Sequence, residues 1–290
     1  MRVRTFLLFG AFFLFLYSGN VLSQNIGQVL SLDNSIPIYY NSNKKGKKEV
    51  LKLEVIDHKY YKIGYWDKHK QSAWVAYLLT REMVEGKKAT RSNKFRMDKK
   101  LSTRPISSSD YTKSGYDRGH ICPSADMSFS QDAQDMTFLM SNISPQLHSF
   151  NAGKWKQLEE KVRQWAIEND SIIVISGPIL DSIKGKIGKN NISVPYSFYK
   201  IIIDISYPDY KAIGFIMPNK KLDQNLYYYS LTIRQVEEAI GMDFFPNLSR
   251  NKLISELETR YSDFGLRSID NKVVKNKKNT KNVKKAKTSN

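Results

Sequence analysis

The chain has 290 residues, of which 41% are hydrophobic and 12% aromatic, so it can bury a full core. This composition excludes a disordered or collagen-like polymer. The formal net charge is +18, and Arg2, Arg4 and the eight lysines of residues 271–290 account for ten of these charges, which leaves +8 on the body of the chain. A basic body suits a polyanionic partner, either nucleic acid or an anionic surface, although charge alone says nothing about the fold.

Residues 1–23 are predicted to be a cleaved export signal. Arg2 and Arg4 supply positive charge, residues 6–17 are almost wholly apolar, and Ser23 is a small residue before the expected cleavage point. An uncleaved membrane anchor is the alternative, although the apolar run is shorter than the ~20 residues of a span. No later segment is apolar enough to span a membrane. We therefore expect a secreted protein, periplasmic or extracellular, with no membrane span in the mature chain.

The chain contains a single cysteine, Cys122. A lone cysteine excludes an intramolecular disulfide and a thiolate-rich metal site. We predict that Cys122 is a small buried apolar residue, with a reactive nucleophile as the alternative.

The middle of the chain contains mostly strand-like segments. Runs rich in β-branched and aromatic residues predict strands at 50–56, 60–65, 73–79, 171–176, 194–205 and 212–217. Apolar residues recurring at three and four predict an amphipathic helix at 151–168. A second helix is predicted at 232–240, with a capping box of Thr232 and Gln235 and with Gly241 as its C-terminal cap. Residues 86–119 read as a long functional loop.

These elements predict an α+β fold in which a central, largely antiparallel sheet is flanked by helices. We place one domain at residues 49–270. Before it, residues 24–48 form a polar arm that we expect to be mobile. After it, residues 271–290 form a Lys-rich tail that we expect to be disordered and to attract polyanions without specificity.

The candidate chemistry lies between Arg91 and Glu159. His120 closes the string Tyr116–His120, in which Asp117 and Arg118 stand beside it and Gly119 would let the backbone approach a ligand. A satisfied structural histidine is the alternative. Downstream, Asn151, Trp155 and Glu159 are spaced by four residues, so they fall on one helix flank and could face one site. Alternatively, Asn151 is an N-cap and Glu159 a solvated acid.

Three linked motifs carry a family resemblance. They are DRGH at 117–120, N-x-x-P-Q at 142–146 and N-x-G-x-W-x-x-L-E at 151–159, in matching order and spacing. The chain thereby resembles the DNA/RNA non-specific endonucleases, the ββα-metal nucleases that include the endonuclease G-like enzymes. The likeness covers roughly residues 60–250. It implies a ββα-metal fold and hydrolysis of phosphodiester bonds in DNA and RNA with little sequence specificity.

The resemblance also implies a role for each matching residue. His120 would be the general base that activates water, since an imidazole pKa near ~6.5 lets a neutral ring accept a proton. Asn151 would be the direct ligand of Mg²⁺, with Mn²⁺ as a possible substitute, and Glu159 would hold the waters of the ion from the second shell. Arg91 would reach the scissile phosphate, and Asn142 would donate to its oxygens.

The resemblance defines the roles of two neighbours of His120 less closely. Arg118 either approaches the phosphate or braces the active-site loop. Asp117 is expected to orient backbone or His120 and not to bind metal. The motifs leave the preferred polymer and a possible homodimer open.

Two other functions also fit parts of the sequence. A non-catalytic extracellular nucleic-acid-binding protein would suit the charge and the tail, but it leaves His120, Asn142, Asn151 and Glu159 unexplained. A metal-dependent phosphodiesterase on small or lipid-linked substrates would share the chemistry, but it would have no need of a basic body.

Overall fold

The computed structural model describes residues 37–42, 48–206, 210–248, 250–262 and 264–266. The predicted export signal and the Lys-rich tail lie outside these residues, so both stay predictions. Within the described residues, no helix combines the length and apolarity needed to cross a membrane.

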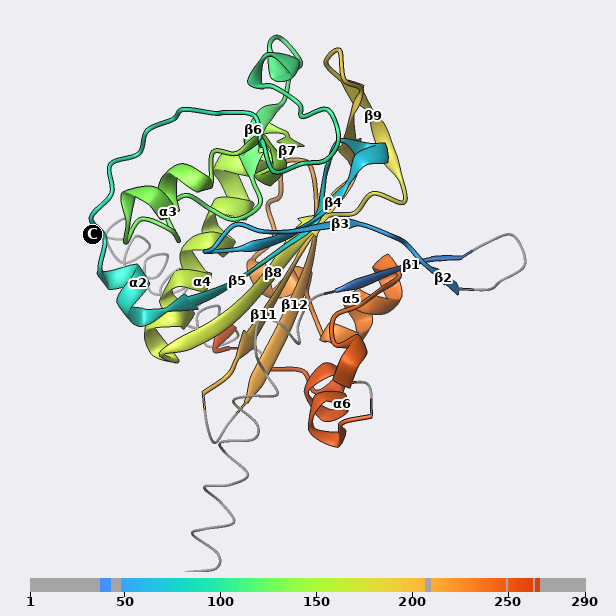
Figure 1. The fold of residues 1–290 in the computed structure, drawn as a ribbon. Helices are drawn as coiled ribbons and strands as arrows, with labels where there is room; N and C mark the ends of the chain where they lie inside the picture. The colour runs from blue at the N-terminus through green and yellow to red at the C-terminus, as the bar shows by residue number, and fades with distance from the viewer. Residues whose placement is uncertain (1–36, 43–47, 207–209, 249, 263, 267–290) are drawn as a thin grey trace, which may run out of the picture.

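A seven-stranded sheet forms the centre of the molecule, and every pair of neighbouring strands in it is antiparallel (Figure 1). This confirms the predicted α+β class. In spatial order the strands are β13 (Ser230–Leu231), β12 (Lys211–Pro218), β11 (Ser197–Asp204), β8 (Ser171–Pro178), β5 (Gln71–Thr80), β4 (Lys62–Trp66) and β3 (Glu54–Asp57).

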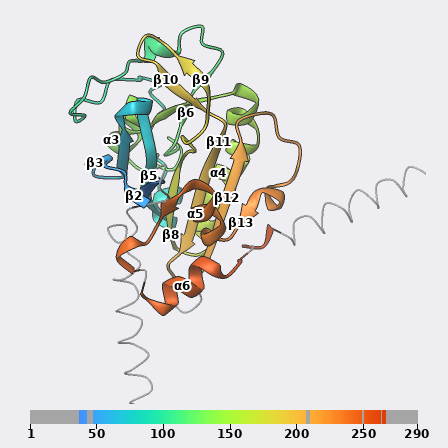
Figure 2. The ribbon, with the colours of Figure 1, turned by 90° about the vertical axis from the view of Figure 1, so that its right-hand side faces the viewer.

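Helices cover both faces of the sheet, as Figures 1 and 2 show. One face carries α2 (Arg81–Glu85), α3 (Gln131–Met136) and the long α4 (Lys156–Glu168). The other face carries α5 (Ile233–Ile240) and α6 (Lys252–Thr259). The central strands are therefore buried on both sides, which explains why Ser171–Ser176 is a continuous apolar run and not an alternating one.

The period-two geometry of the strands divides the core into two clusters. In β8, Ile172 and Val174 pack toward α4, whereas Ile173 and Ile175 pack toward α5 and α6. In β11, Phe198 and Ile202 belong to the α4 side. Lys200 lies between these two in the sequence, so it also points into the α4 side of the core.

Three smaller ladders surround the central sheet. They are β6 (Asp117–His120) with β7 (Ile143–Gln146), β9 (Ile183–Ile187) with β10 (Ile192–Pro195), and β1 (Ile38–Ser42) with β2 (Lys48–Val50) and β14 (Met242–Asp243). The strand predicted at 194–205 is thus two strands separated at Tyr196, and the one at 50–56 is interrupted at 51–53.

The N-terminal arm is partly incorporated into the domain. Residues 38–42, which we expected to precede the domain, pair with β14 and β2. Tyr39 is only 3% exposed and packs in the α5–α6 side of the core. The polar neighbours of Tyr39 led to the prediction of an arm outside the domain. The structure differs because burial of the Tyr39 ring holds this segment against the core.

The β6–β7 hairpin leads into α4 and forms a ββα unit. β6 ends the long segment predicted to be a loop, and its four residues pair in antiparallel register with β7. A wide helical turn, Phe150–Trp155, follows and continues into α4. The three sequence motifs therefore coincide with the two strands and the helix of this unit.

The capping box predicted for α5 is present. Gln235 N donates to Thr232 Oγ1 at 3.2 Å, and Thr232 N donates to Gln235 Oε1 at 2.9 Å. Gly241 ends the helix with a φ of 66°, a left-handed conformation that glycine adopts without strain.

We predict that Thr232→Ala lowers the free energy of unfolding by about 1 kcal/mol, because an N-cap acceptor is lost. The melting temperature should fall by about 2–4 °C. Thr232→Ser, which keeps the hydroxyl acceptor, is the control and should melt within about 1 °C of the parent. Equal melting temperatures for the alanine variant and the parent would contradict the capping role.

Candidate active site

The ββα unit carries an open hollow of about 260 Å³, which we call the His120 hollow. Its lining combines basic side chains with one histidine, one amide and one carboxylate. The lining residues are Arg91, Arg118, His120, Pro123, Ser124, Ala125, Asn151, Ala152, Lys156, Glu159 and Arg163. Five of the six predicted site residues meet here, and Asn142 is the exception.

His120 occupies the last position of β6, and its ring is held by two aromatic neighbours. The ring centroid lies 5.6 Å from that of Phe95 and 4.8 Å from that of Phe138. The side chain is 9% exposed, and its Nε2 has no hydrogen-bond partner among the described residues. The ring is thus fixed in place, and its buried Nε2 is not bonded to any group of the described residues.

The surroundings of His120 favour the neutral imidazole. Burial, and to a smaller extent the positive charge of Arg91, lower the pKa of His120 to about 3. A ring with this pKa is unprotonated at neutral pH, so it can accept a proton.

Asp117 connects β6 to the start of the helix. Asn151 Nδ2 donates to Asp117 Oδ2 at 2.9 Å, and His148 Nδ1 lies 2.9 Å from the same oxygen. The Asn151 amide is therefore oriented with its nitrogen toward Asp117, which leaves its Oδ1 for other partners. The contacts of Asp117 are thus with Asn151 and His148, whereas we expected it to orient backbone or His120.

The predicted helix flank is altered by a kink. Gly153 has a non-helical backbone, with φ −100° and ψ −118°, and the turn that contains it is wider than an α-helical turn. Trp155 is consequently buried against Phe150 and Phe198, with centroids 5.3 and 5.7 Å away. Asn151 and Glu159 line the hollow together, although Trp155 between them does not.

Glu159 interacts with the charged side chains of Lys200, Asp126 and Arg163. Burial raises the pKa of Glu159 to about 7, Lys200 and Arg163 oppose this shift, and Asp126 adds to it. Arg163 Nη1 pairs with Asp126 Oδ1 at 2.8 Å, and Tyr77 donates to Asp126 Oδ2 at 2.7 Å.

Lys200 is a functional candidate that sequence analysis missed. It is fully buried, its Nζ lies 4.7 Å from the Trp155 ring centroid, and this nitrogen has no hydrogen-bond partner among the described residues. Burial lowers its pKa, and the carboxylates of Glu159 and Asp126 oppose that shift. A lysine in an otherwise apolar strand, at an inward-facing position, was the available signal.

Two arginines form the basic wall of the His120 hollow. Arg91 donates through Nε to Asn93 Oδ1 at 2.7 Å and through Nη1 to Ser124 Oγ, and its guanidinium lies 5.1 Å from the Phe138 centroid. Arg118 donates from Nε and Nη2 to Ser108 O at 3.2 and 2.8 Å. Arg118 therefore braces the loop before β6 and lines the hollow at once.

Asn142 lies outside the His120 hollow and is fully buried. Its Nδ2 donates to Cys122 O and Thr137 O, both at 2.9 Å, and its Oδ1 accepts from Cys122 N at 2.8 Å. We expected Asn142 to donate hydrogen bonds to phosphoryl oxygens. These contacts correct that expectation, because both hydrogens of the amide are already donated to backbone oxygens. Asn142 instead fixes the segment that follows His120.

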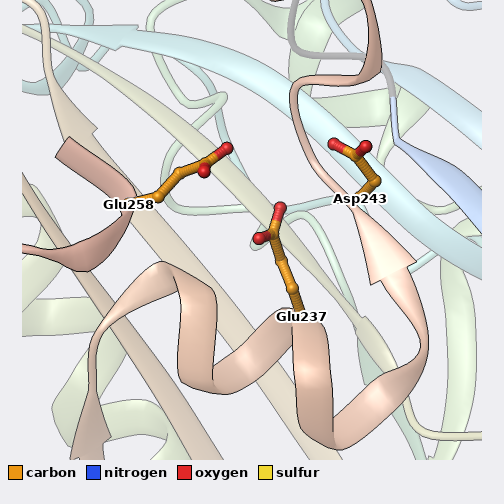
Figure 3. A group of neighbouring side chains, drawn as sticks. All are labelled: Glu237, Asp243 and Glu258. Atoms are coloured by element: carbon orange, nitrogen blue, oxygen red, sulfur yellow. The ribbon is translucent and has the colours of Figure 1, made fainter. Parts of the chain in front are cut away.

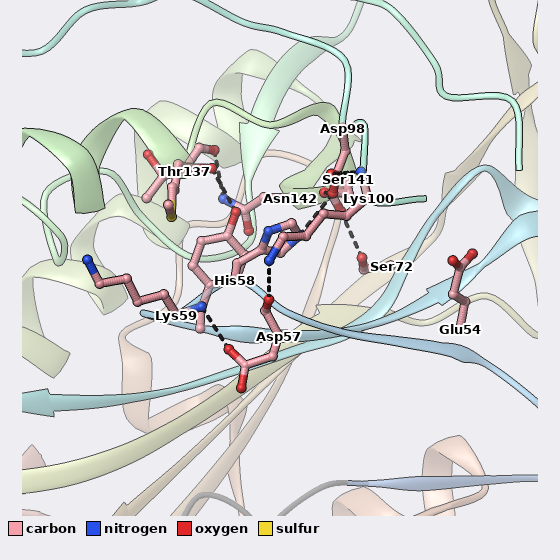
Figure 4. Close-up of polar contacts among 12 residues, drawn as sticks. Glu54, Asp57, His58, Lys59, Ser72, Asp98, Lys100, Thr137, Ser141 and Asn142 are labelled. Carbon is pink, nitrogen blue, oxygen red and sulfur yellow. Dashed lines mark hydrogen bonds and ion pairs between the residues drawn. The ribbon is translucent and has the colours of Figure 1, made fainter. Parts of the chain in front are cut away.

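A buried polar network holds Ser141, the residue before Asn142 (Figure 4). His58 Nε2 lies 2.9 Å from Asp98 Oδ2, and Ser141 donates to that same oxygen at 2.5 Å. Burial alone would raise the pKa of Asp98, but the contacts with His58 and Ser141 bring it below its ordinary value. Both groups bind the carboxylate and are buried away from the hollow, so this Ser–Asp–His set is structural.

Gly119 is required by packing. A Cβ on this residue would lie 2.2 Å from the side chain of Gln146, which crosses the β6–β7 ladder. We expected Gly119 to make room for a ligand, but the close neighbour is part of the protein itself.

The comparisons with known proteins agree with this site. The family model for DNA/RNA non-specific endonucleases matches residues 40–251. The chain belongs to this family. Mitochondrial endonuclease G of Homo sapiens is 30% identical over 202 residues, which cover 65% of this chain and 68% of that protein.

Other relatives come from distant organisms. A nuclease of Nostoc is 30% identical, with 66% of this chain and 73% of that protein covered. Mitochondrial nuclease EXOG of Danio rerio is 32% identical and covers 66% of this chain, but the match spans only 60% of that relative.

A solved structure confirms the ββα-metal nuclease fold. The chain is similar to one in the crystal structure of the EndoG/EndoGI complex, with a TM-score of 0.63 and 29% identity. The match covers 68% of this chain and 87% of that one.

A second group of carboxylates lies across the sheet from these family motifs. Glu237, Asp243 and Glu258 come from α5, β14 and α6, and their oxygens lie within 4.8 Å of one another (Figure 3). Arg234 pairs with both glutamates, at 3.3 Å for Glu237. Arg234 and Glu258 link α5 to α6, and the group lies outside the family motifs, so we assign it a structural role and not that of a nuclease centre.

Glu237 gives a test of these electrostatics. Burial, opposed by the Phe244 amide but reinforced by Glu258, raises the pKa of Glu237 to about 8. The folded state thus keeps a proton that the unfolded state releases near pH 4.5, so the contribution of Glu237 to stability falls as the pH rises from about 4.5 to 8.

We therefore predict that Glu237→Gln, which does not titrate, gains stability relative to the parent across this window, by about 1–3 kcal/mol at pH 8 compared with pH 5. Urea unfolding at the two pH values measures it. Glu238→Gln, on the exposed side of the same helix, should show no such gain. A constant difference between the Glu237 variant and the parent would contradict the raised pKa.

Proposed function

We propose that this protein is a secreted, metal-dependent endonuclease that hydrolyses phosphodiester bonds of DNA and RNA with little sequence specificity. One observation supports this most directly. A neutral His120 lines the same hollow as Asn151, Glu159 and three arginines. A non-catalytic binding protein would have no use for this combination.

In the proposed reaction His120 removes a proton from the attacking water. The low pKa keeps its ring neutral, and the flanking Phe95 and Phe138 keep it in one orientation. Neither aromatic ring competes for the proton, because neither offers a strong acceptor.

The donor set of Asn151 and Glu159 fits a hydrated divalent cation. The hydrogen bond from Asn151 Nδ2 to Asp117 leaves the Asn151 oxygen for a cation. Glu159 is a half-buried carboxylate whose ionised form a cation would stabilise. So few protein ligands suit Mg²⁺, which keeps most of its water, and Mn²⁺ is a possible substitute. When bound, the ion would act as a Lewis acid toward phosphoryl and leaving oxygens.

Arg91 would bind the scissile phosphate, since it is exposed and lines the His120 hollow. Arg118 shares this wall, but its two bonds to Ser108 O commit it mainly to holding the loop in place. Asn142 acts by positioning, through its bonds to the backbone of Cys122 and Thr137.

A polymeric substrate is favoured by the charge of the chain and by the names of the relatives, which include nucleases and endonuclease G. Contacts of arginine and lysine with phosphates carry little sequence information, which suits a non-specific enzyme. Export of the mature chain from residue 24 follows from the predicted signal.

The decisive experiment is a plasmid-nicking assay with purified residues 24–290. We expect relaxed and linear products with Mg²⁺, no products with excess chelator, and recovery when Mg²⁺ or Mn²⁺ is restored. A parallel assay with RNA should behave in the same way. Salt-sensitive binding to plasmid without cleavage in any metal would instead support the binding-protein alternative.

We predict that His120→Ala lowers kcat by about 10²–10⁴-fold, because the general base is lost. Binding of DNA, measured by fluorescence anisotropy, should change little, since the arginines and lysines are intact. Lys252→Ala, which removes an exposed side chain of α6 on the other face of the sheet, is the control. Retention of full turnover by the His120 variant would remove the general-base assignment.

We predict that Asn151→Ala loses most activity and weakens the binding of Mn²⁺ by isothermal titration, because the direct ligand is removed. Asn190→Ala removes an amide that pairs with Asp110 instead, and it should titrate like the parent. A metal titration curve of the Asn151 variant that matches the parent would identify a different ligand.

A further inference from the structure

A second hollow continues from the catalytic one. It has a volume of about 370 Å³, and we call it the Gln134 hollow. It shares Arg91, Ser124, Ala125 and Arg163 with the His120 hollow, so the two hollows adjoin each other. Its remaining lining residues are Val84, Lys87, Ala89, Ser128 and Gln134.

The charge of the Gln134 hollow is positive. Lys87 and Arg91 are exposed, and among the described residues that line the hollow none is acidic. Arg163 is committed to the buried Asp126, but Lys87 forms no ion pair within the described part of the chain. Lys87 is thus a cation that remains available for an anion in the hollow.

The wall that carries these two cations is fixed. The amides of Lys88 and Ala89 both donate to Ser128 O, at 2.8 and 2.9 Å. Thr90 exchanges two hydrogen bonds with the Gln131 side chain, at 3.0 and 3.1 Å. Residues 87–91 are therefore fastened, and Lys87 and Arg91 both line the Gln134 hollow.

Gln134 supplies an unused polar group in this hollow. The residue is 3% exposed, and its Oε1 has no hydrogen-bond partner among the described residues. A buried acceptor without a partner is unfavourable, so a ligand that brings a donor is favoured here. Sugar hydroxyls and the amino groups of bases are donors of this kind.

We propose that the Gln134 hollow is a subsite for the nucleotide next to the scissile phosphate, with Lys87 binding its phosphate and Gln134 accepting a hydrogen bond from its sugar or base. This rests on the proposed nuclease function and extends it. The neighbouring phosphate would reach Lys87 while the scissile one lies at Arg91, because the two hollows adjoin each other and share Arg91. The subsite favours a polymer over a small phosphodiester.

The test compares two substrates of the full mature chain. One is a single-stranded DNA oligonucleotide, and the other is bis(4-nitrophenyl) phosphate, which is too small to reach from Arg91 to Lys87. For Lys87→Ala we expect KM for the oligonucleotide to rise by about three- to tenfold. The slope of log(kcat/KM) against log salt should become shallower by about 0.7, as expected for one lost phosphate contact. Hydrolysis of the small ester should stay unchanged.

Lys252→Ala is the matched control, because it removes the same charge from α6 on the opposite face of the sheet, where Lys252 is 92% exposed. It should leave KM and the salt slope at the parental values. Melting temperatures of all variants report whether they fold.

Gln134→Met keeps the volume and removes the acceptor. It should lower kcat/KM for the oligonucleotide about threefold or more and spare the small ester. Running the assay on DNA and RNA of one sequence distinguishes the donor, since a loss confined to RNA identifies the 2′-hydroxyl and an equal loss identifies the base or another sugar group.

Parental KM and salt slope in Lys87→Ala, or an equal loss on both substrates, would overturn the subsite. A parental kcat/KM in Gln134→Met would remove Gln134 from it. Failure of the proposed function is a separate result, because the parent protein itself would then cleave neither substrate.

Discussion

The hydrogen bond between Asn151 and Asp117 is the contact on which the site depends. Asp117 begins β6, and Asn151 lies in the turn that leads into α4, so this single 2.9 Å contact fixes the hairpin relative to the helix. His120 is three residues further along β6, and Glu159 is in the first turn of α4. His120, Asn151 and Glu159 consequently line one hollow, although they come from different motifs.

Beneath that hollow the protein keeps a compact layer of charge. Lys200, Asp126 and Arg163 alternate in sign, and Glu159 and Arg163 are the members of this set that line the hollow. Leaving one such group buried without its partners costs several kcal/mol, so the set is interdependent. A carboxylate placed here cannot move freely, which suits the task of orienting a hydrated ion.

The sequence predicted much of this arrangement, and the exceptions have physical causes. The sheet and both long helices follow from local periodicity, and the motifs locate His120, Asn151 and Glu159. Lys200 could not be placed, because its importance depends on which face of β11 meets α4. The widened turn at Gly153 is likewise a tertiary feature, since Trp155 must turn into the core while its neighbours remain at the surface.

Asn142 shows a different limit of sequence reasoning. A motif identifies a residue that matters, but not the atoms that it touches. The structure directs its amide to three backbone groups, and thus turns an expected phosphate donor into a support for the segment after His120. Gly119 follows the same pattern, because its missing side chain accommodates Gln146 and not a ligand.

The low pKa of His120 and the positive wall beside it fit a base whose strength depends on substrate. Part of the shift comes from the charge of Arg91, and the rest comes from burial. A phosphate bound at Arg91 would offset that charge, and the proton affinity of the ring would increase as a result. Without substrate the ring stays neutral and available. With substrate in place it would become a better acceptor when the attacking water must lose its proton, so in the proposed mechanism Arg91 would couple phosphate binding to the basicity of His120.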